Sequence, residues 1–105
     1  MRKKPEEALP LAVKAERLAP QLASVIDTLG WFHYRRQSYA EAEKLLTRAV
    51  ERAPSNGVIR FHLALAYAKL GRKSDAVSTL RRAAQLDSKL PERENLTQLI
   101  KDLEG

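Results

Sequence analysis

Apolar residues recur along most of this chain at the three- and four-residue spacing that is typical of amphipathic helices. A first set, between about 23 and 36, places Val25, Ile26, Leu29, Phe32 and His33 on one side. A second set, between about 39 and 53, consists of Ala42, Leu45, Leu46, Ala49 and Val50. Gln37 and Ser38 separate the two sets and Pro54 follows the second, which indicates a tight turn and then a stop. The pattern predicts a pair of antiparallel helices.

The same plan returns 34 residues further along the chain. A step of that length takes Leu29 to Leu63, Ala42 to Ala76, Leu46 to Leu80 and Ala49 to Ala83. Asn56 or Gly57 is expected to begin a helix that runs to Leu70, and Gly71 supplies the backbone freedom that the following turn needs. A fixed period of about 20–50 residues is typical of stacked repeat proteins. The sequence therefore predicts helical repeats.

Both ends of the chain fit this period only in part. The step backwards takes Ala42 to Ala8, Ala49 to Ala15 and Pro54 to Pro20, so we expect 5–20 to form the second helix of a partial repeat. Pro91 is expected to begin a last helix that carries Leu96, Leu99, Ile100 and Leu103 on one face. Such a helix can cover the final apolar surface of a stack. We predict one domain over 1–105, divided into 5–20, 23–56, 57–90 and a capping helix over 91–103.

These residues resemble the tetratricopeptide repeat (TPR) family, whose 34-residue unit reads W-x2-L-G-x2-Y…A-x3-F…P. The matching residues are Leu29, Gly30, Ala42, Ala49 and Pro54, then Leu63, Tyr67, Gly71, Ala76 and Ala83. The departures are Ile26 and Arg60 for tryptophan, His33 for tyrosine and Ser88 for proline. The resemblance implies an all-α fold: a right-handed superhelix of antiparallel helix pairs with a C-terminal capping helix. Residues 26–31 and 60–64 are also similar to the last repeats of long bacterial TPR proteins.

Composition places the chain among ordinary soluble domains, with 44% hydrophobic and 30% charged residues. No apolar run approaches the roughly 18 residues of a membrane span. The N-terminal stretch MRKKPEEALPL has acids where a signal peptide needs apolar residues. Absence of cysteine excludes disulfides and thiolate metal sites. The compartment stays open: cytoplasm, or periplasm if the chain is a fragment of an exported protein.

A net charge of +6 raises the question of a nucleic-acid partner. Lys44, Arg48 and Arg52 form a basic row on one predicted helix, and Arg81 and Arg82 lie in the next repeat. However, no aromatic residues interleave with this row, and basic and acidic residues alternate along the whole chain. We interpret the charge as a solvated surface and keep nucleic-acid binding through this basic outer face as the less favoured alternative.

No arrangement of residues indicates catalysis, a metal or a cofactor. His33 and His62 lack a second ligand at metal-binding spacing, and the turn serines have no context for a nucleophile. The four glycines are isolated and form no phosphate-binding loop. We therefore expect a non-enzymatic protein without a small-molecule substrate.

The resemblance to the TPR family implies that the first helix of each repeat lines an inner groove. The groove residues predicted to bind a partner are Asp27, Trp31, Tyr34, Arg35, Phe61, His62, Leu65 and Lys69. Trp31 is the single tryptophan and stands outside the core pattern of the repeat, which favours an interface anchor. The alternative is that it packs against a neighbouring helix. The predicted function is a protein–protein interaction module, a scaffold or adaptor that binds a peptide or helix.

Self-association is an alternative function. If the stack begins at a second helix, the apolar side of 9–22, with Leu11, Leu18 and Leu22, is left uncovered. Two chains could cover this side mutually as a homodimer, or the chain could be an assembly module of a larger TPR array.

Overall fold

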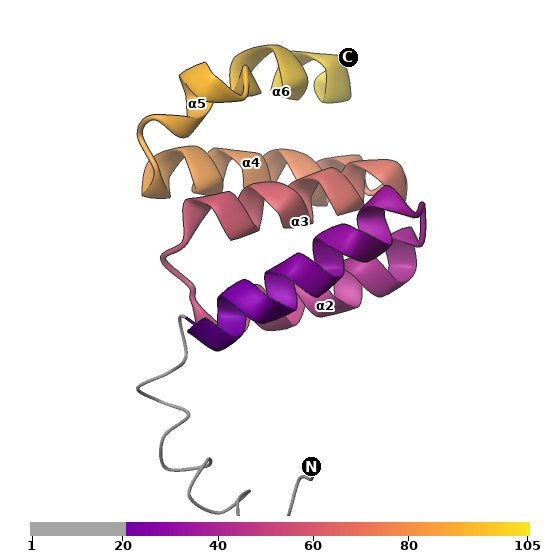
Figure 1. The fold of residues 1–105 in the computed structure, drawn as a ribbon. Helices are drawn as coiled ribbons and strands as arrows, with labels where there is room; N and C mark the ends of the chain where they lie inside the picture. Colours follow the sequence, from indigo (N-terminus) through magenta and orange to yellow (C-terminus); the bar gives the residue numbers. More distant parts are fainter. Residues whose placement is uncertain (1–20) are drawn as a thin grey trace, which may run out of the picture.

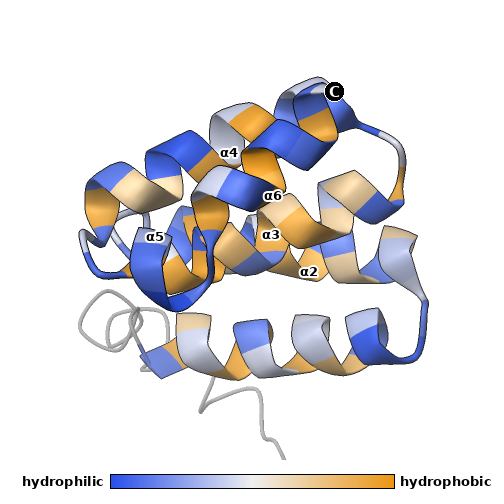
Figure 2. Ribbon diagram, turned by 90° about the horizontal axis from the view of Figure 1, so that it is seen from above, coloured by the Kyte–Doolittle hydropathy of each residue, from blue (hydrophilic) through white to orange (hydrophobic). Residues whose placement is uncertain are grey.

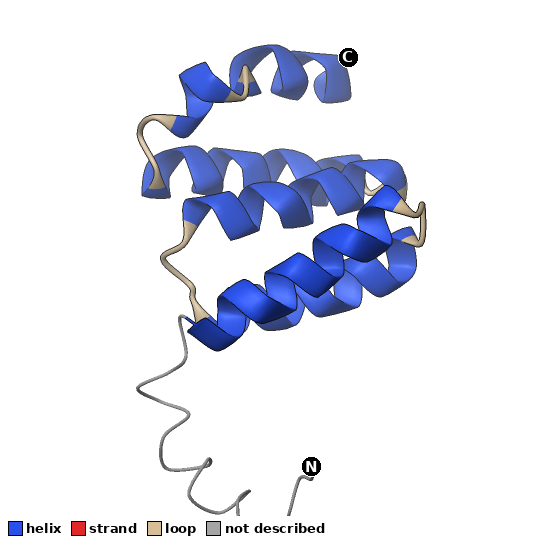
Figure 3. Cartoon of the chain, viewed as in Figure 1, coloured by secondary structure: helices blue, strands red, loops and turns tan. Residues whose placement is uncertain are grey.

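The computed structural model of the chain describes residues 21–105, which form antiparallel helices stacked in layers (Figure 1). A first helix over 21–35, here called the leading helix, is followed by α2 (Tyr39–Arg52), α3 (Gly57–Lys69) and α4 (Lys73–Leu86). The short helix α5 (Leu90–Arg93) and the helix α6 (Leu96–Glu104) complete the described part. Helices and connecting turns alternate throughout this part of the chain (Figure 3). The helix predicted over 5–20 lies outside the described residues.

Helix α3 lies at the centre of the stack, because it packs against α2 on one side and α4 on the other. Its sequence, GVIRFHLALAYAK, is apolar on most sides, as a helix with two covered faces requires. Leu63 and Ala66 are buried with Ala42 and Leu46 of α2. On the side of α4, the larger core cluster consists of Phe61, Ala64, Leu80, Ala83, Leu90 and Leu96. Apolar residues accordingly recur along α3 and the helices around it (Figure 2).

The predicted boundary at Asn56 agrees with the structure. The Oδ1 of Asn56 accepts a hydrogen bond from the backbone N–H of Ile59 at 3.0 Å, the arrangement of a helix N-cap. The Nε–H of Arg60 donates to the carbonyl oxygen of Pro54 at 3.1 Å and ties the preceding turn to the same helix. These local bonds fix the point at which α3 begins.

The C-terminal helix that the sequence predicted over 91–103 is divided in the structure into α5 and α6. Asn95, between them, has a left-handed backbone with φ of 53°. Leu90 and Leu96 are both fully buried in the same cluster. On one continuous helix, side chains six residues apart point about 120° away from each other, so these two leucines would face different sides. The break at Asn95 lets both leucines pack in the same core cluster.

Two equivalent turns close the helix pairs in the described part, and only one of them has glycine at the strained position. Gly71 has φ of 79°, and Gln37, one 34-residue step earlier, has φ of 67°. A left-handed backbone costs a residue with a side chain about 1–2 kcal/mol, whereas glycine adopts it freely.

Replacing Gln37 by glycine is therefore expected to raise the free energy of unfolding by about 0.5–1 kcal/mol. This is the relief of left-handed strain less the extra entropy that glycine loses on folding. Urea denaturation followed by circular dichroism measures the change. The reciprocal variant Gly71→Gln is the control and is expected to lower stability, and equal signs for the two variants would contradict the explanation.

Candidate functional site

Trp31 is held between two other rings where the leading helix meets α3. Its ring stacks on Tyr34 with centroids 4.5 Å apart and planes at 4°, and on His62 with centroids 4.3 Å apart and planes at 26°. Tyr34 lies one turn further along the same helix, whereas His62 comes from α3. Stacked aromatic pairs of this kind contribute about 0.5–1.5 kcal/mol each beyond their buried area. Trp31 nevertheless stays partly exposed.

A hydrogen bond between the two helices orients His62. The Nδ1–H of His62 donates to Oδ1 of Asp27 at 2.8 Å, since an ionised carboxylate can only accept. Both side chains are mostly buried, with 18% and 17% of their surfaces exposed. The His62 ring is thus fixed at its edge by Asp27 and on its face by Trp31. Asp27 is used in this contact, so its carboxylate is turned toward the protein.

Tyr34 connects the ring stack to the core. Its ring meets that of Tyr39 edge to face, with centroids 5.3 Å apart, and packs beside the buried residues Ala42 and Leu46. Burial, and to a lesser extent the neighbouring Tyr39, raises the pKa of Tyr34 above its ordinary value of 10.0. The Tyr34 hydroxyl therefore stays protonated at physiological pH and can donate a hydrogen bond.

Two exposed cations lie at the C-terminal ends of the two helices that form the aromatic stack. Arg35 and Lys69 stand one 34-residue step apart, at the end of the leading helix and of α3. Within residues 21–105, no carboxylate lies at ion-pair distance from either of them. Leu65, between His62 and Lys69 on α3, is half-buried. The face therefore combines aromatic surface with the positive charge of Arg35, and Lys69 adds a second positive charge at the end of α3.

A hollow of about 480 Å³ continues this surface along the leading helix. Its lining residues are Thr28, Trp31, Phe32, Arg35 and Arg36. The guanidinium of Arg36 lies over the ring of Phe32, 5.4 Å from its centroid, which is a cation–π contact. The sequence prediction did not include Phe32 and Arg36 in the site. The available signal was the large Phe32 at a place where the next repeat has the small Ala66.

The residues predicted to bind a partner do not all lie on this face. The structure brings together Asp27, Trp31, Tyr34 and His62, and Arg35 lines the same hollow as Trp31. Leu65 packs against the core cluster on the side of α4, and Lys69 lies about two turns beyond His62 on α3. Phe61 is a correction: it is only 8% exposed and belongs to the core with Leu80 and Leu90. The reason is that α5 and α6 supply Leu90 and Leu96, which pack in the same cluster as Phe61. Phe61 therefore stabilises the fold and is left out of the site.

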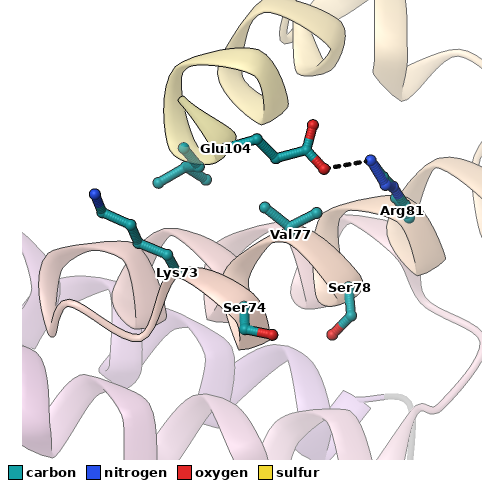
Figure 4. A pocket seen from close by; sticks show the side chains of 7 residues that line it. Lys73, Ser74, Val77, Ser78, Arg81 and Glu104 are labelled. Carbon is teal, nitrogen blue, oxygen red and sulfur yellow. Dashed lines mark hydrogen bonds and ion pairs between the residues drawn. The ribbon is translucent and has the colours of Figure 1, made fainter.

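A second hollow, of about 380 Å³, lies between α4 and the end of α6 (Figure 4). Val77 and Leu103 give it apolar surface, and Lys73 and Arg81 lie at its edge. Arg81 donates to Oε2 of Glu104 at 2.7 Å, so its charge is already balanced. This hollow has no aromatic residue. It offers less binding surface than the face around Trp31.

Other kinds of site find little support in the described part of the chain. Residues 21–105 contain no group of three His, Cys, Asp or Glu side chains that could hold a metal ion. None of the helices described there is both long and apolar enough to cross a membrane. In the basic row on α2, Lys44 pairs with Glu41 at 3.6 Å. Together with the Arg81–Glu104 pair, this contact places acids among the outer cations.

Comparison with known proteins identifies the repeat. A sequence model described as "Tetratricopeptide repeat" matches residues 28–91, which is more than half of the chain. The chain belongs to the tetratricopeptide repeat family. Membership confirms the predicted recognition and the predicted fold class, an all-α stack of antiparallel helix pairs. Repeats of this family generally serve as protein–protein interaction modules and are typically non-catalytic scaffolds.

A bacterial relative supports the same conclusion. A TPR repeat-containing protein of Pseudomonas aeruginosa is 38% identical over 52 residues, which is 50% of this chain. The matched stretch is 9% of the length of that relative, so the chain spans only a small part of it. The likeness therefore concerns the repeats.

Proposed function

We propose that this TPR chain is a non-enzymatic scaffold or adaptor that binds a segment of a partner protein. The contact surface is the face formed by the leading helix and α3 around Trp31. One observation carries the proposal: a partly exposed tryptophan, stacked on both Tyr34 and His62, lines a hollow together with the exposed cation Arg35.

Rigidity is what makes this tryptophan suited to binding. Ordering a flexible side chain at an interface costs about 0.5–1.5 kcal/mol, and a ring that is already stacked avoids most of this cost. Tryptophan and arginine are enriched among the residues that dominate binding energy. Trp31 and Arg35 supply one of each on neighbouring turns of the same helix.

Charge indicates the chemistry of the partner segment. Asp27 is paired with His62, and the exposed cations at the C-terminal ends of the two helices are Arg35, Arg36 and Lys69. A complementary segment carries an apolar or aromatic anchor for the stack and acidic side chains for these cations. An amphipathic helix or an extended peptide of this composition fits the surface, and either is a common form of peptide recognition.

The proposal is tested with peptides that the protein itself selects. A random peptide library displayed on phage is panned against the purified chain, and the affinity of the best selected peptide is then measured. Trp31 is the single tryptophan of the chain, so its fluorescence reports binding at this face. We expect selected peptides to be rich in Asp and Glu around a large apolar residue.

Charge reversal gives a matched comparison. Arg35→Glu and Lys69→Glu are each expected to weaken binding about 5- to 20-fold, which is about 1–2 kcal/mol. Lys44→Glu and Arg48→Glu make the same change in charge on the exposed outer side of α2 and are expected to alter affinity less than twofold. Equal losses from both pairs of variants would show a general electrostatic attraction and contradict the proposed face.

A further inference from the structure

An apolar stripe runs along the leading helix, beside the face that carries Trp31. It consists of Val25, Leu29 and Phe32, which are 59%, 49% and 53% exposed. Their spacing of four and three residues places them on one face of the helix. Apolar residues recur along this helix in Figure 2.

The next repeat shows how the same positions are used when they are covered. One 34-residue step takes Val25, Leu29 and Phe32 to the α3 residues Ile59, Leu63 and Ala66, which are 3%, 6% and 0% exposed. They pack in the same clusters as residues of α2, the helix that directly precedes α3. The stripe on the leading helix is thus the surface against which a preceding helix packs in this repeat.

The segment directly before the leading helix has the residues that this role needs. Ala8, Ala15 and Pro20 precede Ala42, Ala49 and Pro54 by 34 residues, so the segment is in register with α2.

The side chains on the two facing helices also differ in size in a complementary way between the two repeats. Leu46 and Ala66 belong to one buried cluster between α2 and α3. Their equivalents one step earlier are Ala12 and Phe32, so a large residue faces a small one in both cases, with the roles reversed. Exchanges that conserve volume are those that a packed core tolerates best.

We propose that residues 8–20 of this same chain cover the stripe in the register of α2, with Ala12 against Phe32 and Ala15 against Val25. The leading helix then becomes an interior helix of the stack. Phe32 also lines the hollow next to Trp31, so the segment would border that hollow, while the rings of Trp31, Tyr34 and His62 stack where the leading helix meets α3. The proposal is independent of the function proposed above.

The chain has no cysteine, so an engineered pair gives an unambiguous test. Two double variants of the full chain, Ala12→Cys with Phe32→Cys and Ala15→Cys with Val25→Cys, are oxidised and analysed by mass spectrometry and non-reducing electrophoresis. Lys14→Cys with Phe32→Cys is the control, since Lys14 corresponds to the exposed Arg48 of α2. We expect an intramolecular disulfide in at least one of the two test pairs and none in the control.

A second measurement does not depend on disulfide geometry. Alkylation of the single variant Val25→Cys is compared with that of Ser24→Cys, its exposed neighbour on the same helix, in the full chain. We expect the thiol at 25 to react at least about tenfold more slowly. Disulfide-linked dimers would instead show that a second copy covers the stripe, and equal alkylation rates would show that it is open. Either result overturns the proposal.

Discussion

Replacing Leu46 by alanine is expected to lower the free energy of unfolding by about 3–4 kcal/mol, within the range found for buried leucines. Leu46 is fully buried and packs with Leu63 and Ala66, while its side chain also fills the space above Gly30. It therefore joins the leading helix, α2 and α3. A small domain has about 5–15 kcal/mol in total, so this loss is large. Urea denaturation followed by circular dichroism measures it.

A second substitution tests the reason for that loss. A Cβ at Gly30 would lie 2.8 Å from Cγ and 2.9 Å from Cδ2 of Leu46, so Gly30→Ala alone is expected to cost about 1–3 kcal/mol through overpacking. When Leu46 is also alanine, the clash disappears. The double variant should then be at least about 1 kcal/mol more stable than the sum of the two losses predicts.

The matched control combines Gly30→Ala with Leu80→Ala. Leu80 is the fully buried equivalent of Leu46 in the next repeat and lies in a different core cluster. The two losses should add within about 0.5 kcal/mol, because the sites are separate. If the losses of stability caused by Gly30→Ala and Leu46→Ala also add, the two residues are not coupled by close packing, and the explanation given for Gly30→Ala is contradicted.

Trp31→Ala is expected to weaken binding of the selected peptide at least about 30-fold, or about 2 kcal/mol, as at residues that dominate interfaces. The variant removes the anchor and also frees the His62 ring from one of its two supports. Trp31→Phe keeps an aromatic ring between Tyr34 and His62 and should retain intermediate affinity. Calorimetry measures these affinities, since the fluorescence of Trp31 is lost with the residue.

Leu70→Ala serves as the control for this prediction. Leu70 is an apolar residue at the end of α3, 38% exposed and outside the ring stack. Its truncation should change affinity less than twofold. Circular dichroism of every variant checks that the helices are intact. If Leu70→Ala weakened peptide binding as much as Trp31→Ala does, Trp31 would not be the anchor of the interface.

Much of the fold could be predicted from the sequence, because helix pairs and their stacking depend on local spacing and on the period. The helical spacing of apolar residues placed the leading helix, α2, α3 and α4, and the residue type of Asn56 predicted the start of α3. The division between α5 and α6 could not be predicted in this way. It depends on the three-dimensional core that draws in both Leu90 and Leu96, and a left-handed Asn95 is a consequence of that packing.

The site could be predicted only in outline. Family geometry predicted which residues of the leading helix share a face, and Trp31 and Arg35 do line one hollow. The hydrogen bond between Asp27 and His62 joins residues 35 positions apart and has no counterpart in the repeat. The equivalent of Asp27 one step later is Phe61, and that of His62 one step earlier is Thr28. A contact that is not repeated leaves no periodic signal.

The proposed binding face is tested most directly by recording ¹H–¹⁵N NMR spectra of the full chain while the selected peptide is added. We predict that the largest shift changes occur at the Trp31 indole and at the backbone of Tyr34, His62, Leu65 and Lys69. The outer residues Lys44 and Arg48 of α2 should change little. If the largest changes instead lay on the outer side of α2 or in the hollow between α4 and α6, the face around Trp31 would not be the binding site.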